Sequence, residues 1–494
     1  MPSGSSSKLA SIGVAGLDDI LGGGLTPNRL YLLEGMPGSG KTTLAFQFLM
    51  AGARQGESVL YVTLSETEEE IRAVAQSHGW SLDGIHVREL VPTQDSLEPD
   101  EQYTMFHPSE VELSDTTRKI LEDVERIKPS RLVFDSLSEL RLLAGTPLRY
   151  RRQILALKHY FSGQQCTVLL LDDLTGEDHD LQVQSIAHGV VLLEQNTPDY
   201  GQQRRRLNVL KYRGKDFRGG YHDYVIRRGG LEVFPRLIAA EHKSVHAKAR
   251  LASGIAELDQ LLGGGLDRGM STLITGAAGT GKSSMAAIFA FAAAQRGERA
   301  ALFIFDESES TLLSRMLALG VDFQPHIESG RVVIRQVDTA EWSPGQFSNA
   351  VRLAVSHSGC SVIIIDSLNG FMHSMPNERF LIIQLHEILT FLGQQGVATV
   401  MINAQLGLIG QMQSQVDASY LADAVILTRY FEIDAEVRMA VSVLKKRGSA
   451  HERTIREFTF KGGRIQVGEP LRGYHGVLTG VPTRAAVKGG EPMP

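Results

Sequence analysis

The chain has 494 residues, a length that favours two domains of about 200 to 250 residues over a single large core. Its composition, 43% hydrophobic and 21% charged, is typical of water-soluble globular proteins, and no apolar run of about 18 residues could span a bilayer. The formal net charge of −6 argues against a dedicated nucleic-acid binder, because neutralising phosphates requires a basic surface.

The start of the chain and its cysteines indicate where the protein works. Residues 1–10, MPSGSSSKLA, are polar and lack the apolar core of a secretory signal, so we expect a flexible leader and a cytoplasmic protein. Cys166 and Cys360 each adjoin an apolar strand-like run. This predicts small buried thiols, with no disulfide framework and no cysteine metal site.

The sequence contains an internal repeat. GVAGLDDILGGGL at 13–25 recurs as GIAELDQLLGGGL at 254–266, and each copy continues with a glycine-rich loop, a strand-like run ending in Asp-Ser-Leu and a later K-x-R-G segment. Such self-similarity predicts two homologous domains. The expected divisions are a first domain at 11–240, a boundary within 239–248, a second domain at 250–470 and a C-terminal tail at 471–494.

Within each copy, short aliphatic runs alternate with helical patterns. In the first copy a strand-like run at 29–35 leads into the glycine loop, a helical pattern follows at 42–56, and another strand-like run lies at 58–64. This alternation predicts an α/β fold in which each domain has a mostly parallel central sheet flanked by helices. A stretch at 89–117 has many carboxylates and no lysine or arginine; it is either a solvated insertion or a docking loop for a partner.

Both glycine loops match the pattern G-x-x-x-x-G-K-[ST]. Glycines allow a turn that aims successive backbone N–H groups inward, and the following helix adds its positive N-terminal dipole, so the loop attracts phosphate. The lysine is expected to reach the β- and γ-phosphates of ATP. The predicted ATP-binding residues are Gly35, Gly38, Ser39, Gly40, Lys41, Thr42 and Thr43 in the first copy, and Gly276, Gly279, Thr280, Gly281, Lys282, Ser283 and Ser284 in the second.

Hydroxyl and carboxylate groups near the loops predict a magnesium site and catalytic acids. The residues expected to hold Mg²⁺ are Thr42 and Ser283 directly, and Asp135 and Asp366 through water. A carboxylate one strand away from each loop could orient or deprotonate the attacking group. The predicted catalytic acids are Glu66, Asp306 and Glu307. The alternative is structural, since strand-ending Asp residues also cap turns and Asp or Glu favours the first turn of a helix.

Two basic pairs recur late in each copy, Lys211 with Arg213 and Lys445 with Arg447. Each pair lies in a strand-like run and is spaced so that both cations point to one side. Their recurrence favours a contact with the γ-phosphate on a neighbouring subunit, as an arginine finger supplied in trans. The alternative is an exposed strand face.

Taken together, the two P-loops, the LDxLLGGG element before each, the glutamate after the second strand and the K-x-RG strand resemble the KaiC family of circadian clock ATPases and autokinases. The resemblance covers nearly the whole chain and is closest at 420–433 and 446–460. It implies RecA-like domains stacked as two rings of a hexamer, with ATP bound between neighbouring subunits. It also implies a slow ATPase in the first ring and phosphorylation of Ser/Thr residues in the second.

The family's motifs do not all match. Its paired glutamates fall on Ser65 and Glu66 in the first copy and on Asp306 and Glu307 in the second. Its adjacent Ser-Thr phosphosites fall on Ser419 and Tyr420, with Ser414 as a weaker candidate. The longer Tyr420 side chain cannot put its oxygen where a threonine oxygen would lie. Because one carboxylate is missing at Ser65, the first ring could also be a nucleotide-locked scaffold without turnover.

The sequence thus predicts an ATP- and Mg²⁺-dependent ATPase and Ser/Thr autokinase that acts as a regulatory ring, controlled by nucleotide and phosphorylation. Clock-type or signalling proteins are the expected partners, and nucleic acid and membranes are not. The segment 473–494 resembles the start of the family's regulatory tail. The competing hypothesis is a RecA/RadA-like DNA-dependent ATPase, which would be stimulated by single-stranded DNA.

Overall fold

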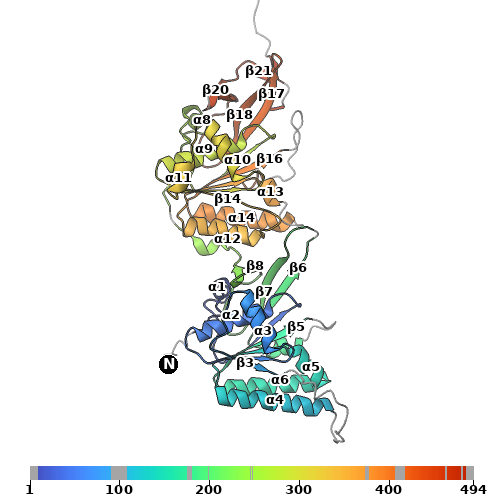
Figure 1. Cartoon of the computed structure of the whole chain (residues 1–494). Coiled ribbons are helices and arrows are strands. Elements are labelled where there is room, and N and C mark those ends of the chain that lie inside the picture. The colour runs from blue at the N-terminus through green and yellow to red at the C-terminus, as the bar shows by residue number, and fades with distance from the viewer. Residues whose placement is uncertain are drawn as a thin grey trace, which may run out of the picture. The chain divides into compact units, whose positions relative to one another are not determined.

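The computed structural model describes residues 9–90, 108–174, 181–198, 200–244, 246–247, 249–372, 378–405, 418–461, 464–479 and 482–484. Contacts within the chain divide it into two units, Met1–Arg236 and Leu237–Pro494. Each unit is an α/β domain (Figure 1).

The first unit is built on one nine-stranded sheet in the order β3-β2-β4-β5-β1-β6-β7-β8-β9. The strands from β3 to β6 pair in parallel, and β7, β8 and β9 continue the sheet in antiparallel pairs. Their bounds are β1 (Leu30–Gly35), β2 (Val59–Thr63), β3 (Ile85–Glu89), β4 (Arg131–Asp135), β5 (Thr167–Asp173), β6 (Gly189–Asn196), β7 (Arg204–Tyr212), β8 (Tyr221–Arg227) and β9 (Gly230–Phe234).

Alternate residues of these central strands enter two different cores. Tyr31 and Leu33 of β1 belong to the core on one face, whereas Leu30 and Leu32 belong to the core on the other. Because both faces are covered, the strands read as continuous apolar runs. Helices α1 (Ala15–Ile20), α2 (Lys41–Ala53) and α3 (Glu68–Ser77) cover the first face, and α4 (Pro108–Ile127), α5 (Leu137–Ala144), α6 (Pro147–Gly163) and α7 (Leu181–Ile186) cover the second (Figure 1).

The second unit repeats this architecture with the order β14-β13-β15-β16-β12-β17-β18-β19-β20. The strands from β14 to β17 are parallel, and the last three are antiparallel. Their bounds are β12 (Ser271–Gly276), β13 (Ala300–Ile304), β14 (Val332–Gln336), β15 (Val362–Asp366), β16 (Ala398–Ala404), β17 (Ala424–Ile433), β18 (Glu436–Lys446), β19 (Arg456–Lys461) and β20 (Arg464–Pro470).

The second sheet is also covered on both faces. Ile274 of β12 lies in one core and its neighbour Leu273 in the other. One core contains residues of α8 (Ala256–Leu261), α9 (Lys282–Gln295), α10 (Glu309–Ala318) and α11 (Gln324–Glu328), and the other contains residues of α12 (Pro344–Ser356), α13 (Leu368–Met372) and α14 (Glu378–Gln394) (Figure 1). Both units therefore confirm the predicted α/β fold with mostly parallel sheets flanked by helices.

The segments at the edges of the domains differ in detail from the sequence expectation. Ala10, assigned to the leader, is buried and exchanges two backbone hydrogen bonds of 2.8 Å with Leu25, so the folded chain includes it. Residues 1–8 of the expected leader lie outside the described residues. In the second unit, a short antiparallel pair, β10 (Arg250–Leu251) with β11 (Leu266–Asp267), precedes the sheet.

The junction between the units lies at Arg236 and Leu237, just before the expected boundary segment 239–248. Leu237 and Ala239 pack in a core of the second unit, and Ala239, in the short 3₁₀-helix η2 (Ala239–His242), donates its N–H to the Glu387 carboxylate on α14. The linker is thus tied to α14.

The C-terminal segment packs on the sheet of the second unit. Val477, in the 3₁₀-helix η3 (Val477–Thr479), joins a small apolar cluster with Phe431 and Ile433 of β17. An Arg429 N–H donates to the Thr479 carbonyl at 2.9 Å. Two short strands, β21 (Tyr474–His475) and β22 (Thr483–Arg484), pair beside it, and residues 485–494 of the expected tail lie outside the described residues.

Two further expectations are tested by the fold. Cys166 and Cys360 are free and buried, as predicted, and burial raises the pKa of the Cys166 thiol to about 12. Among the residues that the structure describes, no helix is both long and apolar enough to cross a membrane.

A buried histidine makes the first unit sensitive to acid. His222 is only 1% exposed; its Nδ1 accepts the Arg236 N–H and its Nε2 faces the Arg218 carbonyl, both at 2.9 Å, so the ring is neutral and protonated on Nε2. Burial is the main cause that lowers its pKa to about 4, the Arg218 and Arg236 charges add to it, and the Arg218 carbonyl and Asp19 oppose it. Between pH 6.5 and 4 the unfolded chain therefore binds a proton that the folded chain does not.

We expect the free energy of unfolding of the first unit to fall by up to about 2 to 3 kcal/mol as the pH falls from 7 to 4 through this group. Replacing His222→Gln should remove most of that dependence. The measurement is urea unfolding by tryptophan fluorescence in a Trp342→Phe background, which leaves Trp80 of the first unit as the only tryptophan. His86→Gln, at an exposed site, is the control, and an unchanged pH profile in His222→Gln would contradict the assignment.

Candidate nucleotide-binding and catalytic sites

The first P-loop follows β1 and leads into α2. Gly38 and Gly40 have φ of 79° and 95°, in the left-handed region that favours glycine. A Cβ added at Gly35 would lie 2.8 Å from the Leu193 carbonyl oxygen on β6, so this position has no room for a side chain. The loop therefore turns tightly against β6, the parallel neighbour of β1, and α2 begins at Lys41.

The second P-loop, between β12 and α9, has the same geometry. Gly279 and Gly281 have φ of 81° and 80°. A Cβ at Gly276 would lie 2.1 Å from the Thr428 carbonyl oxygen on β17. Thr280 is buried, and its hydroxyl lies 2.7 Å from that of Thr428, which ties the loop to the sheet.

Each loop holds its lysine beneath it. Lys41 and Lys282 are both 6% exposed. The Lys41 ammonium donates to two loop carbonyls at 2.7 and 3.2 Å and lies 2.6 Å from the Asp173 carboxylate, at the end of β5. The Lys282 ammonium donates to one loop carbonyl at 2.6 Å. Burial lowers the pKa of Lys282 to about 8, and Asp366 partly opposes this shift.

The predicted magnesium ligands meet at the carboxyl ends of β4 and β15. The Thr42 hydroxyl donates to the Asp135 carboxylate at 3.2 Å, and Tyr61 donates to the same oxygen at 2.5 Å. Burial raises the pKa of Asp135, and it raises that of Asp366 to about 6, where the Ser283 hydroxyl counteracts it. A cation bound nearby would therefore stabilise the charged form of both carboxylates.

The acids differ between the two sites. Glu66 lies between β2 and α3, and its Oε2 is buried with no hydrogen-bond partner among the described residues. Burial raises the pKa of Glu66, and the charges of Asp135, Glu70 and Asp173 add to this effect. Its neighbour Ser65 is exposed. Of the two first-site positions that correspond to the family's paired acids, only Glu66 therefore carries a carboxylate.

At the second site both acids are engaged. Asp306 accepts the Ser367 hydroxyl at 2.5 Å, and Glu307 accepts two hydrogen bonds from the Arg315 guanidinium at 2.8 and 3.0 Å. Arg315 lies on α10, and the corresponding residue on α3 of the first unit is Val74. The base candidate of the second site is thus held in an ion pair that has no counterpart among the described residues of the first site.

The two cationic pairs lie at the opposite ends of the strands from the P-loops, beside the starts of β6 and β17. We call this end of each sheet its far edge. Lys211 pairs with the second residue of β6, and Lys445 with the second residue of β17, whereas the loops follow the ends of β1 and β12. A strand of six residues such as β12 is about 16 Å long. Lys211 and Arg213 donate to the Ser185 carbonyl at 3.2 and 2.7 Å, and Arg447 lies 3.7 Å from Asp423.

Two of the phosphosite candidates, Ser419 and Tyr420, lie at this same far edge. Ser419 is half-buried in the turn before β17, and its carbonyl accepts a hydrogen bond from Lys445 at 3.0 Å. Tyr420 is 54% exposed. Ser414, like residues 91–107 of the acidic stretch, lies outside the described residues. The chain therefore does not bring Ser419 to its own P-loop.

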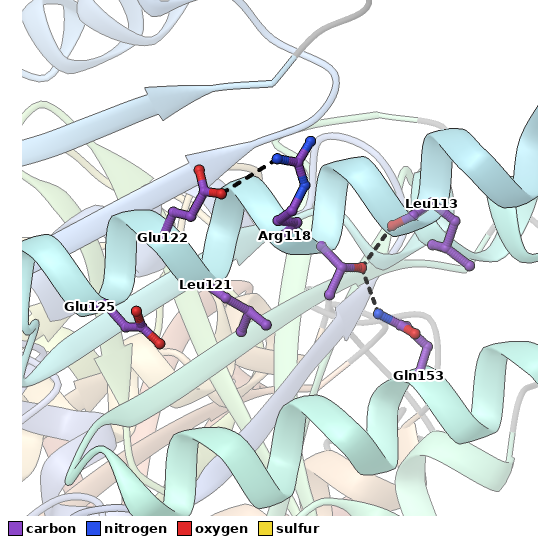
Figure 2. A pocket seen from close by; sticks show the side chains of 7 residues that line it. Leu113, Arg118, Leu121, Glu122, Glu125 and Gln153 are labelled. Atoms are coloured by element: carbon purple, nitrogen blue, oxygen red, sulfur yellow. Dashed lines mark hydrogen bonds and ion pairs between the residues drawn. The ribbon is translucent and has the colours of Figure 1, made fainter.

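A pocket of about 590 Å³ lies between α4 and α6 of the first unit (Figure 2). Arg118 and Glu122 form an exposed ion pair at its rim, and Gln153 of α6 donates to Thr117 of α4. Its lining residues are Leu113, Thr117, Arg118, Leu121, Glu122, Glu125 and Gln153. None of them is among the predicted site residues.

Sequence reasoning missed Asp173 and Arg315. Asp173 ends the apolar run TVLLLDD, the same signal that identified Asp135 in LVFD, so the strand-end pattern could have found it. Arg315 has no comparable signal, because its pairing with Glu307 depends on the direction in which α10 runs after the loop that carries Glu307.

Comparisons with known proteins agree with this architecture. The family model described as "ATPase: KaiC" matches the chain twice, over residues 10–238 and 251–472. The circadian clock protein KaiC3 of Synechocystis sp. is 28% identical over 96% of this chain and 94% of its own length. The circadian clock oscillator protein KaiC of Picosynechococcus sp. is 29% identical over 96% of this chain and 92% of its own. With two tandem RecA-like domains, each matched by that model, the chain belongs to the KaiC family of ATPases.

Proposed function

We propose that the protein is a ring-forming ATPase and autokinase that binds MgATP at both P-loops, hydrolyses it in the first domain and transfers phosphate to Ser419 in the second. The observation that carries the proposal is the duplicated loop. At each, a buried lysine lies under a glycine turn beside a hydroxyl and carboxylate pair, Thr42 with Asp135 and Ser283 with Asp366.

The residues present fit a triphosphate with magnesium. The left-handed conformations of Gly38, Gly40, Gly279 and Gly281 allow the turn that aims backbone N–H groups at a phosphate. The hydroxyl and carboxylate oxygens are the ligands that Mg²⁺ prefers. When bound, Mg²⁺ would neutralise charge on the β- and γ-phosphates. Lys41 and Lys282 would exchange their loop carbonyls for phosphate oxygens.

In the first domain, Glu66 is proposed to orient the attacking water. Its buried, unpartnered oxygen and its raised pKa suit a group that accepts a proton as the reaction proceeds. Water attacks the γ-phosphorus, the bond to the β-phosphate oxygen breaks, and ADP leaves while the proton passes to the carboxylate. A scaffold without turnover is the alternative for this domain, because Ser65 provides no second carboxylate.

In the second domain, phosphoryl transfer is proposed to cross between chains. Ser419 lies at the far edge of the sheet from its own P-loop, beside Lys445. In a homo-oligomer, which we take to be a hexamer, this edge would face the loop of a neighbouring subunit, and the cationic pairs Lys211 with Arg213 and Lys445 with Arg447 would approach its γ-phosphate. Glu307 or Asp306 would accept the serine proton after the Arg315 ion pair opens.

The biological role is proposed by similarity. The relatives carry the names of circadian clock proteins. Phosphate on Ser419 would add about −1.5 to −2 charges beside Lys445, enough to change packing at a subunit edge. We propose a cytoplasmic regulatory ring that presents different surfaces to clock-type or signalling partners in its different nucleotide and phosphate states.

Removing either lysine should empty one site and leave the other. Lys41→Ala and Lys282→Ala are each expected to lower bound nucleotide from two to one per chain, because the β- and γ-phosphates lose their buried cation. Equilibrium dialysis with labelled ATP and Mg²⁺ measures the stoichiometry. Lys243→Ala, at an exposed site, serves as the control. Two bound nucleotides in either loop variant would refute the assignment of that loop.

Autokinase activity should leave label on Ser419. Full chain incubated with γ-labelled ATP and Mg²⁺ is expected to carry label on Ser419 by mass spectrometry, and Ser419→Ala and Lys282→Ala should each abolish it when tested alone. In a mixture, Ser419→Ala chains should label Lys282→Ala chains, since transfer crosses between subunits. Phosphate release without label would reduce the function to ATP hydrolysis, and several-fold stimulation by single-stranded DNA would favour the RecA/RadA-like alternative.

A further inference from the structure

At the first P-loop, a carboxylate lies where a phosphate would be expected to meet the lysine. Asp173 ends β5, directly opposite Gly35 of β1 in the parallel register. Its Oδ1 lies 2.6 Å from the Lys41 ammonium, and its Oδ2 accepts a weaker hydrogen bond from Ser138 at 3.3 Å. The lysine side chain is 7% exposed and the aspartate side chain 28% exposed, so solvent screens this ion pair only in part.

The second site lacks this carboxylate. In the equivalent register, Gly276 of β12 lies opposite Ala404 at the end of β16. Among the described residues, no carboxylate forms an ion pair with Lys282, whose ammonium donates to a loop carbonyl. Within the part of the chain that the structure describes, the loop thus occurs in two forms, one with a competing anion and one without.

Asp173 also adds negative charge to the rest of the first site. Its charge is one of the causes that raise the pKa of Glu66 and of Asp135. Asp173 therefore adds a third carboxylate, beside Asp135 and Glu66, to the site where the γ-phosphate of ATP would arrive. An incoming γ-phosphate would have to displace the Asp173 carboxylate from Lys41. It would then remain close to that carboxylate, and the repulsion between the two anions also opposes binding.

We propose that Asp173 competes with the γ-phosphate for Lys41, so that the first site binds ATP more weakly and releases it faster than the second, and that this penalty is larger for ATP than for ADP. The inference rests on the proposed binding of nucleotide at both loops. Asp173 acts through Lys41 and is a positioning residue. The discrimination arises because ADP has no γ-phosphate to place beside the carboxylate.

The test isolates each site in the full chain. In a Lys282→Ala background, Asp173→Asn should tighten MgATP binding about three- to tenfold, tighten ADP binding less, and slow the release of a fluorescent ATP analogue. In a Lys41→Ala background, Ala404→Asp should weaken MgATP binding at the second site, weaken ADP binding less, and speed the release of the ATP analogue. Circular dichroism and the stoichiometry of bound nucleotide confirm that each variant is folded.

The possible outcomes separate the two proposals. If the Lys282→Ala parent binds no nucleotide, or still binds two per chain, the proposed function fails before Asp173 is tested. If the parent binds one nucleotide and Asp173→Asn leaves the ATP affinity unchanged or weakens it, the competition is refuted, and weakening would make Asp173 a ligand of the metal or nucleotide. An equal gain for ATP and ADP would refute the selectivity for the γ-phosphate.

Discussion

Each domain has one buried lysine ammonium at its P-loop, Lys41 in the first and Lys282 in the second, and the rest of the site is arranged around it. Moving a lysine cation out of water costs several kcal/mol unless acceptors surround it. Loop carbonyls provide some of those acceptors, two for Lys41 and one for Lys282. The parallel sheet then determines which other side chains can reach the cation, since the neighbouring strands end at the same edge.

The two copies use this constraint differently. Their sheets have the same order and their loops the same turns. The first site adds Tyr61 and Asp173 around its Asp135, whereas the second has Leu302 and Ala404 at the corresponding register positions. Similar backbones therefore give one site rich in competing anions and one in which a nearby acid is held by an arginine. The differences lie in the side chains that the strands and α10 present to each site, whereas both glycine turns keep the same left-handed conformation.

Much of this organisation can be predicted from the sequence, because it depends on residues that are close together in the chain. The loop pattern, the apolar runs and the duplicated LDxLLGGG element each depend on neighbouring residues, and the α/β class follows from their alternation. The contacts that tune the sites are not local. Asp173 meets Lys41 across a strand pairing, Glu307 meets Arg315 through the path of α10, and Ala10 joins the fold through a bridge to Leu25. Each of these contacts joins residues from separate elements, so it can be identified only once the strand pairing or the path of the helix is known.

The burial of both native thiols has a practical consequence. Thiolate is the reactive form of cysteine, and burial raises the pKa of Cys166 and of Cys360. Maleimide reagents should therefore react with neither cysteine in the folded chain. A cysteine introduced at Tyr200, which is 87% exposed, would give a single attachment point for a fluorophore or spin label. Spectroscopy could then proceed on a protein that keeps both of its own cysteines.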